Sequence, residues 1–302
     1  MRAVYATLVI VASVLAVSMA AYGSASPLVV SANDGALTSI QDAIDTAETG
    51  GIVVIRSGTY KENLLIDRPV TLIGEDGAII VPEDPSQPAI AVRETEGIFL
   101  QGLTILDAVV GIELTNSSCA ILDCVIRASG IGVDSVAFQG TTVLLNHVEF
   151  RGSSTGTGMA LLGMGLTLLA DCEFDLFGTG ASLGGTVCAV IRACSFKRCF
   201  DGLAILDTAT VTLLGNTVRD NHGSGIGLSR NPEQVPDGRL LLLENTFEQN
   251  GDWGISLCGF DALEPDIRFG RIEGAENAFR GNGRGRTCPE DLALPAGFFL
   301  EE

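Results

Sequence analysis

Residues 216–228 read NTVRDNHGSGIGL, and residues 245–257 read NTFEQNGDWGISL. In each copy, a short segment ends in an apolar residue, Val218 or Phe247, and a stretch led by glycine follows. The same closing apolar position recurs along the chain at spacings of 21, 24, 24, 22, 22, 29 and 32 residues, at Ile105, Ile126, Phe150, Phe174, Phe196, Val218, Phe247 and Phe279. A short, nearly constant period of this kind indicates a solenoid.

The glycine-led stretch keeps register with the closing residue. It reads GIEL at 111–114, GIGV at 130–133, GMAL at 158–161, GASL at 180–183, GLAI at 202–205, GIGL at 225–228 and GISL at 254–257. Each unit of about 22 residues contains three β-prone stretches, and helical spacing is absent between residues 50 and 285. These features predict an all-β fold, a single-stranded right-handed parallel β-helix of about 9–10 coils.

An interior column is expected two residues before each closing residue. It runs from apolar and cysteine side chains into asparagine: Leu103, Cys124, Val148, Cys172, Cys194, Asn216, Asn245 and Asn277. Asparagine tolerates left-handed dihedrals and its amide can bond to an asparagine one coil away, so we expect a three-Asn ladder. Cys172 and Cys194 are expected to be small buried hydrophobes. Cys258 and Cys288 follow the glycine-led strands of consecutive coils, so they are the preferred disulfide.

The ends of the solenoid should be covered. Thr38 or Ser39 can cap a short amphipathic helix at about residues 38–48, which would close the N-terminal end. A C-terminal cap is expected at about residues 286–302.

The first 25 residues indicate in which cellular compartment the protein is located. Arg2 precedes an apolar run at residues 3–21 and then small residues, which is typical of a secretory signal peptide. An uncleaved anchor is the alternative, since this run could just span a bilayer. Both place residues 26–302 outside the cytoplasm, secreted or periplasmic, with no membrane insertion once the signal is cleaved.

The composition limits the partners and cofactors. The chain has 37 Asp and Glu against 18 Lys and Arg, a net charge of −19, so phosphate backbones and anionic lipid repel it and nucleic-acid binding is disfavoured. Eight Cys form no CxxC pair, and two His are too few for the usual zinc ligand sets. No metal and no cofactor is expected.

The repeats resemble those of the right-handed parallel β-helix family, the pectin-lyase-like superfamily. Residues 58–64, GTYKENL, with 71–74 are similar to the first coil of such proteins, and 216–228 and 245–255 are similar to repeats of NosD-type exported β-helix proteins. The resemblance covers roughly residues 33–290 and implies the fold. The catalytic blocks of polygalacturonase-like hydrolases, pectinesterases and alginate epimerases are missing, so the resemblance implies no particular reaction.

Two surface columns bear on function. The outward position of the glycine-led strands is small and nearly uncharged: Glu113, Gly132, Ala160, Ser182, Ala204, Gly227 and Ser256. This weakens a paired-carboxylate mechanism on that face. The position after the closing residue is basic in five of eight coils and could bind an acidic polysaccharide through Arg127, Arg151, Lys197 and Arg219. The alternative, which we favour, is a lattice of ion pairs that includes Glu149, Glu173 and Asp175.

A third cluster is expected in the turns before three successive glycine-led strands. It holds Asp201, then Asp220 and His222, then Asp252 and Trp253. A carboxylate beside a histidine could act as an acid–base pair, and the tryptophan could stack on a sugar ring. Ordinary turn chemistry also explains Asp, His and Gly at such positions, and we favour that interpretation.

Three functions remain open from the sequence. The leading hypothesis is a non-catalytic exported β-helix protein that binds polysaccharide, a cell-surface glycan or another surface partner. The second is a polysaccharide lyase or glycoside hydrolase acting on an acidic polysaccharide at Asp201, Asp220, His222 and Asp252. The third is a structural surface-layer protein.

Overall fold

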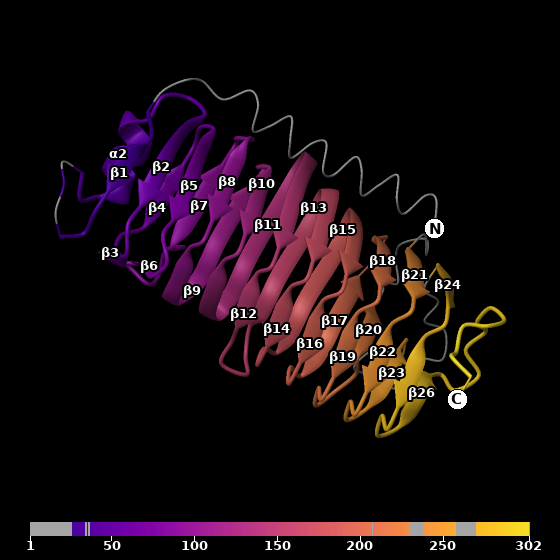
Figure 1. Cartoon of the computed structure of the whole chain (residues 1–302). Helices are drawn as coiled ribbons and strands as arrows, with labels where there is room; N and C mark the ends of the chain where they lie inside the picture. The colour runs from indigo at the N-terminus through magenta and orange to yellow at the C-terminus, as the bar shows by residue number, and fades with distance from the viewer. Residues whose placement is uncertain are drawn as a thin grey trace.

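The computed structural model describes residues 26–33, 35, 37–206, 208–229, 238–257 and 270–301. Its strands wind into a parallel β-solenoid of about nine turns, seen as a stack of arrows in Figure 1. Each turn of the solenoid passes through three sheets, which we call sheets I, II and III in chain order. The predicted all-β parallel β-helix is confirmed.

Sheet I begins the solenoid and continues to its last described coil. It contains β1 (Leu28–Val30), β2 (Gly51–Ile55), β5 (Val70–Gly74), β8 (Ile98–Gln101), β10 (Cys119–Leu122), the ends of β11 (Val125–Asn146), β13 (Thr157–Ala170) and β15 (Thr179–Arg192), then β18 (Thr210–Leu214), β21 (Arg239–Leu243) and β24 (Arg271–Ala275).

Sheet II carries the closing apolar residues of the repeat. It contains β3 (Gly58–Lys61), β6 (Ala78–Val81), the starts of β9 (Thr104–Thr115) and β11, then β12 (Glu149–Arg151), β14 (Glu173–Asp175), β16 (Ser195–Lys197), β19 (Thr217–Arg219), β22 (Thr246–Glu248) and β25 (Ala278–Arg280).

Sheet III carries the glycine-led stretches. It contains β4 (Leu64–Ile66), β7 (Ile90–Arg93), the end of β9, the middle of β11, the starts of β13 and β15, then β17 (Asp201–Leu206), β20 (Ile226–Ser229), β23 (Trp253–Ser256) and β26 (Gly285–Cys288).

Stacked rings fill the interior beside sheet II. The centroids of Phe150 and Phe174 are 4.5 Å apart, and those of Phe174 and Phe196 are 4.7 Å apart. These distances match the spacing of paired strands, about 4.8 Å, so each ring lies on the ring one coil away. A Cβ placed on Gly158 would lie 2.7 Å from the Phe174 ring, which explains why the repeat needs glycine there.

The predicted asparagine ladder is present at the corner between sheets I and II. The Asn216 amide donates to Asn245 Oδ1 at 2.9 Å, and the Asn245 amide donates to Asn277 Oδ1 at 3.0 Å. The Cys194 backbone N–H donates to Asn216 Oδ1 at 2.9 Å. All three amides are buried, so these bonds satisfy groups that water cannot reach.

A second ladder, which the sequence reasoning missed, lies at the corner between sheets II and III. The Asn221 amide donates to Asn250 Oδ1 and the Asn250 amide donates to Asn282 Oδ1, both at 2.9 Å. Each of these residues follows a first-ladder asparagine by five positions, and that spacing was the available signal. The last described coils are therefore fixed by amides at two corners.

The cysteines have two chemical states. Cys172 and Cys194 are buried and free, as predicted. Burial raises the pKa of Cys124 and Cys199 to about 11, so these thiols stay protonated near neutral pH. Cys288 is disulfide-bonded. Cys258 lies outside the described residues, and its pairing with Cys288 stays a prediction.

Helix α2 (Ile40–Thr46) covers the N-terminal end and is slightly shorter than predicted. Ser39 is its N-cap, and the Glu62 carboxylate accepts from the N–H groups of Ile40 and Gln41, both at 2.9 Å. The Gln41 side-chain amide bonds to both the N–H and the carbonyl of Leu65, at 2.8 and 3.2 Å. This side chain takes the place of a neighbouring strand and blunts the exposed edge of β4.

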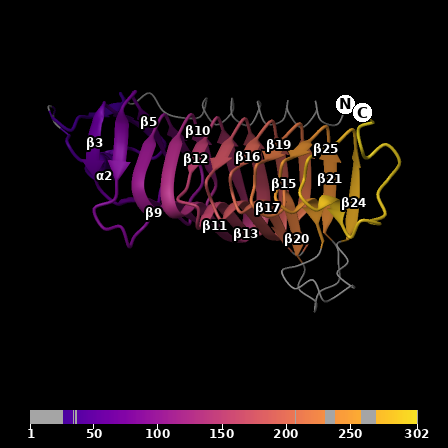
Figure 2. The same cartoon turned by 90° about the horizontal axis from the view of Figure 1, so that it is seen from below.

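Two phenylalanines cover the other end. Phe298 is buried, and its ring centroid is 6.4 Å from that of Phe279 in the last coil. Phe299 forms a parallel bridge with Asn277, so the first asparagine ladder ends on backbone instead of water. Figure 2 shows the two ends of the rod far apart, with α2 at one end and the C-terminal segment at the other. Within the described residues, no helix is long and apolar enough to cross a membrane.

Candidate functional site

The predicted turn cluster lies at the corner between sheets II and III, with Gly223 at its centre. The Gly223 N–H donates to the Phe200 carbonyl at 2.6 Å, and the Gly223 carbonyl accepts from the Asp252 N–H at 3.0 Å. A Cβ on Gly223 would lie 2.5 Å from Asp201 Oδ1. Asp201 and Asp252, two coils apart, are therefore brought to the two sides of one glycine.

Asp201 is partly buried. Its Oδ1 accepts from the Ser224 N–H at 2.7 Å. Burial raises the pKa of Asp201, and the charge of Asp252 raises it further, while the bond from Ser224 opposes both effects. Asp201 is thus held in one orientation by backbone.

Asp220 and Asp252 are each engaged by an arginine. Asp220 Oδ2 lies 2.5 Å from Arg219 Nη1, and Asp252 Oδ1 lies 2.9 Å from Arg284 Nε. Within the described part of the chain, no hydrogen bond or ion pair joins Asp220 to His222. The structure therefore does not assemble the carboxylate–histidine pair that an acid–base mechanism would use at this turn.

Three rings lie at this corner on three successive coils. Phe200, which the sequence reasoning missed, is 52% exposed. His222 is exposed, and its Nδ1 lies 3.3 Å from the Cys199 carbonyl. Trp253 is half-buried, and a Cβ on Gly285 would lie 3.0 Å from its ring. We call Asp201, Asp252 and these three rings the corner surface.

The basic column on sheet II is largely neutralised. Lys197 Nζ lies 2.9 Å from Glu173 Oε2, Arg151 pairs with Glu149, and Arg219 pairs with Asp220. The same column contains Asp175, which is buried and accepts a two-pronged bond from Arg198. Of the five bases in this column, Arg127 and Arg280 form no ion pair among the described residues. The other three form the ion-pair lattice that we favoured, which reduces the free positive charge available to an acidic ligand.

The outward column of sheet III differs from the prediction at one coil. Asp134, not Gly132, stands between Glu113 and Ala160 in the pairing register. The error arose because two glycines, Gly130 and Gly132, both precede a β-branched residue.

That correction places two carboxylates side by side. Burial raises the pKa of Asp134, and the adjacent charge of Glu113 raises it further. Arg93 Nη2 lies 3.5 Å from Glu113 Oε1. The small, uncharged surface expected for sheet III therefore holds only from Ala160 onward.

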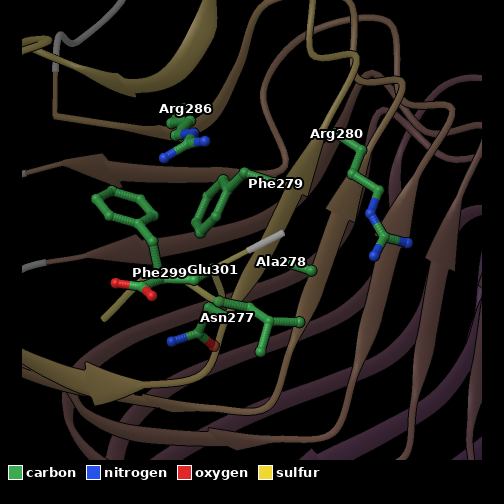
Figure 3. A pocket seen from close by; sticks show the side chains of 8 residues that line it. Asn277, Ala278, Phe279, Arg280, Arg286, Phe299 and Glu301 are labelled. Atoms are coloured by element: carbon green, nitrogen blue, oxygen red, sulfur yellow. The ribbon is translucent and has the colours of Figure 1, made fainter. Parts of the chain in front are cut away.

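A small hollow lies beneath the C-terminal segment. Figure 3 shows Phe299, Phe279 and Arg286 lining it, with Arg280 farther along the sheet. Its volume is about 40 Å³, and the Arg286 guanidinium lies 5.0 Å from the centroid of the Phe299 ring. The hollow has room for about one or two water molecules, so it is a feature of the cap.

The sequence model described as "Right handed beta helix region" matches residues 88–282. The chain belongs to this β-helix family. A cell surface glycoprotein of Methanothermus fervidus is 30% identical over 93 residues, which is 30% of this chain and 16% of that protein. The chain thus spans only a small part of this curated relative.

Solved β-helices share the architecture. A pectate lyase superposes with a TM-score of 0.66 at 10% identity, covering 94% of this chain and 80% of that one. An alginate lyase from Paenibacillus superposes with a TM-score of 0.63 at 12% identity, covering 87% and 96%. At such low identity these likenesses show the fold alone.

Within this β-helix the structure describes no cluster of three or more His, Cys, Asp or Glu that could hold a metal ion. Two features of the site escaped the sequence reasoning. Phe200 was recognisable as an aromatic residue inside a turn, and Asp134 as the residue two positions after an equivalent glycine. Among the described residues, the features that could contact a ligand are therefore the corner surface and the adjacent carboxylates of Glu113 and Asp134.

Proposed function

We propose that the chain is an extracytoplasmic, non-catalytic β-helix module that binds glycan at the corner surface. The observation that supports this most is the presence of exposed or half-exposed rings on three successive coils, Phe200, His222 and Trp253, beside fixed carboxylates. Sugar rings stack on aromatic faces and their hydroxyls donate to carboxylates. A row of stacked coils repeats such contacts along an extended chain.

The state of the carboxylates supports binding over catalysis. Asp201 is engaged by a backbone N–H, and Asp220 and Asp252 are paired with arginines. A general acid or base must reach the proton that it transfers, and a group held by a fixed partner is better suited to orienting a hydroxyl.

Four observations support the location and the ligand class. Residues 1–25 have the pattern of a secretory signal, and the disulfide at Cys288 suits an oxidising compartment. The relative in Methanothermus fervidus is named a cell surface glycoprotein, and the solved neighbours include polysaccharide lyases.

Charge favours a neutral glycan over an acidic one. The net charge is −19, and three of the four predicted binding cations, Arg151, Lys197 and Arg219, are in ion pairs. A polyanion would have to displace those pairs against long-range repulsion. A neutral polysaccharide does not have to displace those ion pairs, and the net charge of the chain does not repel it.

A panel of neutral and acidic polysaccharides tests the proposal, with retention and new chain ends scored together. We expect retention on a neutral glycan, no new ends, and at least about tenfold weaker binding in Phe200→Ala and Trp253→Ala. Phe138→Ala, at an exposed phenylalanine away from the corner, is the matched control. Retention that is equally weakened by Phe138→Ala, or no retention at all, would remove the corner surface as the site.

One observation favours a second function, a carbohydrate-active lyase or hydrolase. Glu113 and Asp134 occupy adjacent strands of sheet III at the same register, beside Arg93. Carboxyl groups about 5 Å apart suit retaining hydrolysis, and an arginine beside them could bind an acidic sugar. New chain ends that disappear in Glu113→Gln and Asp134→Asn, but persist in Asp220→Asn, would establish the enzyme and place its chemistry on sheet III.

A further inference from the structure

Most positions on the outer face of sheet I are apolar. Two outward columns run along its eleven described strands, one from Val29 to Ala275 and one from Ile52 to Glu273, and 15 of their 21 positions are apolar. Leu144, Leu168 and Val190 stand side by side in the middle. Each is partly exposed. Soluble monomers rarely present so long an apolar face.

The fold does not impose this pattern, because sheet II shows the opposite one. Its two outward columns contain Glu149, Glu173, Lys197 and Glu248 on strands of the same kind. Only two charged residues stand in these two columns of sheet I, and the exposed Arg239 and Arg271 lie beside the columns at the starts of β21 and β24. Arg192 is paired with Asp171 at 3.5 Å, and Glu273 lies in β24, the last described strand of sheet I. An apolar surface therefore reaches from β1 to β21, interrupted by single polar residues such as Gln101, Asn146 and Arg192.

We propose that the outer face of sheet I is the surface through which two copies of this chain pack, sheet on sheet. Equal columns of leucine and valine at a repeat of about 4.8 Å can interdigitate with a second identical set, and paired sheets pack about 10 Å apart. Such contact uses one patch on both partners, which a two-fold axis satisfies. Both partners then remove the apolar side chains of sheet I from water.

The available area is sufficient. Eleven strands span about 48 Å, and about five residues per strand span about 16 Å, which gives on the order of 770 Å² per copy. The pair would bury about 1,500 Å², within the range of stable protein interfaces.

The charge of the chain favours a second copy, and not a lipid surface, as the partner of the outer face of sheet I. The net charge of −19 opposes an anionic bilayer, and the described face carries no belt of lysine or tryptophan to anchor it in head groups. Two copies also repel, but most of their described acidic groups lie in turns and on the other sheets, and salt screens groups separated by more than about 8 Å. The association should therefore tighten as the salt concentration rises.

Sedimentation velocity on the full chain, with its N-terminus verified by mass, tests the interface. We expect a dimer at micromolar concentration, a dissociation constant raised at least about 100-fold in Leu144→Glu with Leu168→Glu, and tighter association at about 0.5 M than at about 0.05 M salt. Leu162→Glu, at a leucine 54% exposed on sheet III, is the matched control and should leave the dimer unchanged.

A milder substitution tests the interface in case the glutamate variants fail to fold. Leu168→Thr keeps a β-prone residue and should weaken the dimer about tenfold while circular dichroism and urea unfolding stay near those of the parent chain. A monomer at about 100 µM, or equal weakening by Leu162→Glu, would overturn the proposal. So would a monomer that binds neutral-lipid vesicles through Leu144 and Leu168.

Discussion

The corners of this solenoid are built in two ways, and the change occurs near residue 194. Before it, the corner between sheets I and II is filled by Leu103, Cys124, Val148 and Cys172. After it, the same column contains Asn216, Asn245 and Asn277, joined by amide bonds. The sheets continue unchanged through the boundary. The strand ladder therefore specifies the fold, and the corner chemistry sets how each half resists unfolding.

The difference indicates which interactions stabilise the corner between sheets I and II in each half of the solenoid. An apolar corner gains free energy from burial and loses it gradually as methyl groups are removed. An amide corner gains little net free energy from each bond, but one missing partner leaves several buried groups without bonds. The asparagine half should be the more sensitive to single substitutions.

The largest effect should come from the middle of the first ladder. Asn245 accepts from the Asn216 backbone and amide, both at 2.9 Å, and donates to the Leu213 carbonyl at 2.9 Å. Asn245→Ala should lower the free energy of unfolding by about 4 kcal/mol, since it orphans at least two buried groups. Val148→Ala, at the equivalent apolar corner, should cost about 2 kcal/mol. Urea unfolding of both variants measures the difference, and equal costs would contradict the comparison.

Both halves of the solenoid have the glycines that lead the strands of sheet III. Substituting such a glycine should therefore lower the stability by a similar amount in either half. A Cβ on Gly158 would lie 2.7 Å from the Phe174 ring, and one on Gly225 would lie 3.0 Å from the Phe247 ring. Gly158→Ala and Gly225→Ala should each cost about 3 kcal/mol from overpacking. Gly140→Ala, where nothing lies within 4 Å of the new Cβ, should change stability by less than about 0.5 kcal/mol. A large gap between Gly158→Ala and Gly225→Ala in thermal unfolding would mean that the halves also differ inside.

Moving an asparagine into the apolar half tests whether a ladder needs neighbours. Val148→Asn places an amide between Cys124 and Cys172, neither of which has an amide to return its bonds. It should destabilise the chain by about 2 kcal/mol. Adding Cys172→Asn should recover about 1 kcal/mol of that loss, because the second amide supplies a partner. A double-mutant cycle in urea with no favourable coupling energy would show that adjacency alone does not make a ladder.

How far the sequence could predict the molecule follows from the same contrast. Periodic apolar residues and glycines define strands and register, because a parallel stack repeats each position at one spacing. The first ladder was predictable because Asn216, Asn245 and Asn277 share an offset from the closing residue. The register at Gly130 and Gly132 was not, since two glycines satisfy the same pattern and only packing selects one. Ion pairs such as Lys197 with Glu173 depend on rotamers, which the pattern does not encode.

The smallest effect concerns two half-buried carboxyl groups, one in each half. Burial raises the pKa of Asp134 and that of Asp201 above the ordinary value of 3.8. Between 3.8 and the raised value the folded chain binds more protons than the unfolded chain, so stability falls as the pH rises through that window. Asn at either position removes this loss, and the advantage of the variant should disappear below the window.

Asp134→Asn should show the larger pH effect of the two. The neighbouring Glu113 adds to the effect of burial on Asp134, whereas the Ser224 N–H opposes it on Asp201, and that bond survives partly in Asp201→Asn. Water screens both groups, so the gain should be a few tenths of a kcal/mol at neutral pH. Urea unfolding from pH 3 to pH 7 measures it. A larger gain from Asp201→Asn would mean that Asp252, two coils away, acts on Asp201 more strongly than the adjacent strand acts on Asp134, and the two carboxylates of the corner surface would then have to be treated as one coupled pair.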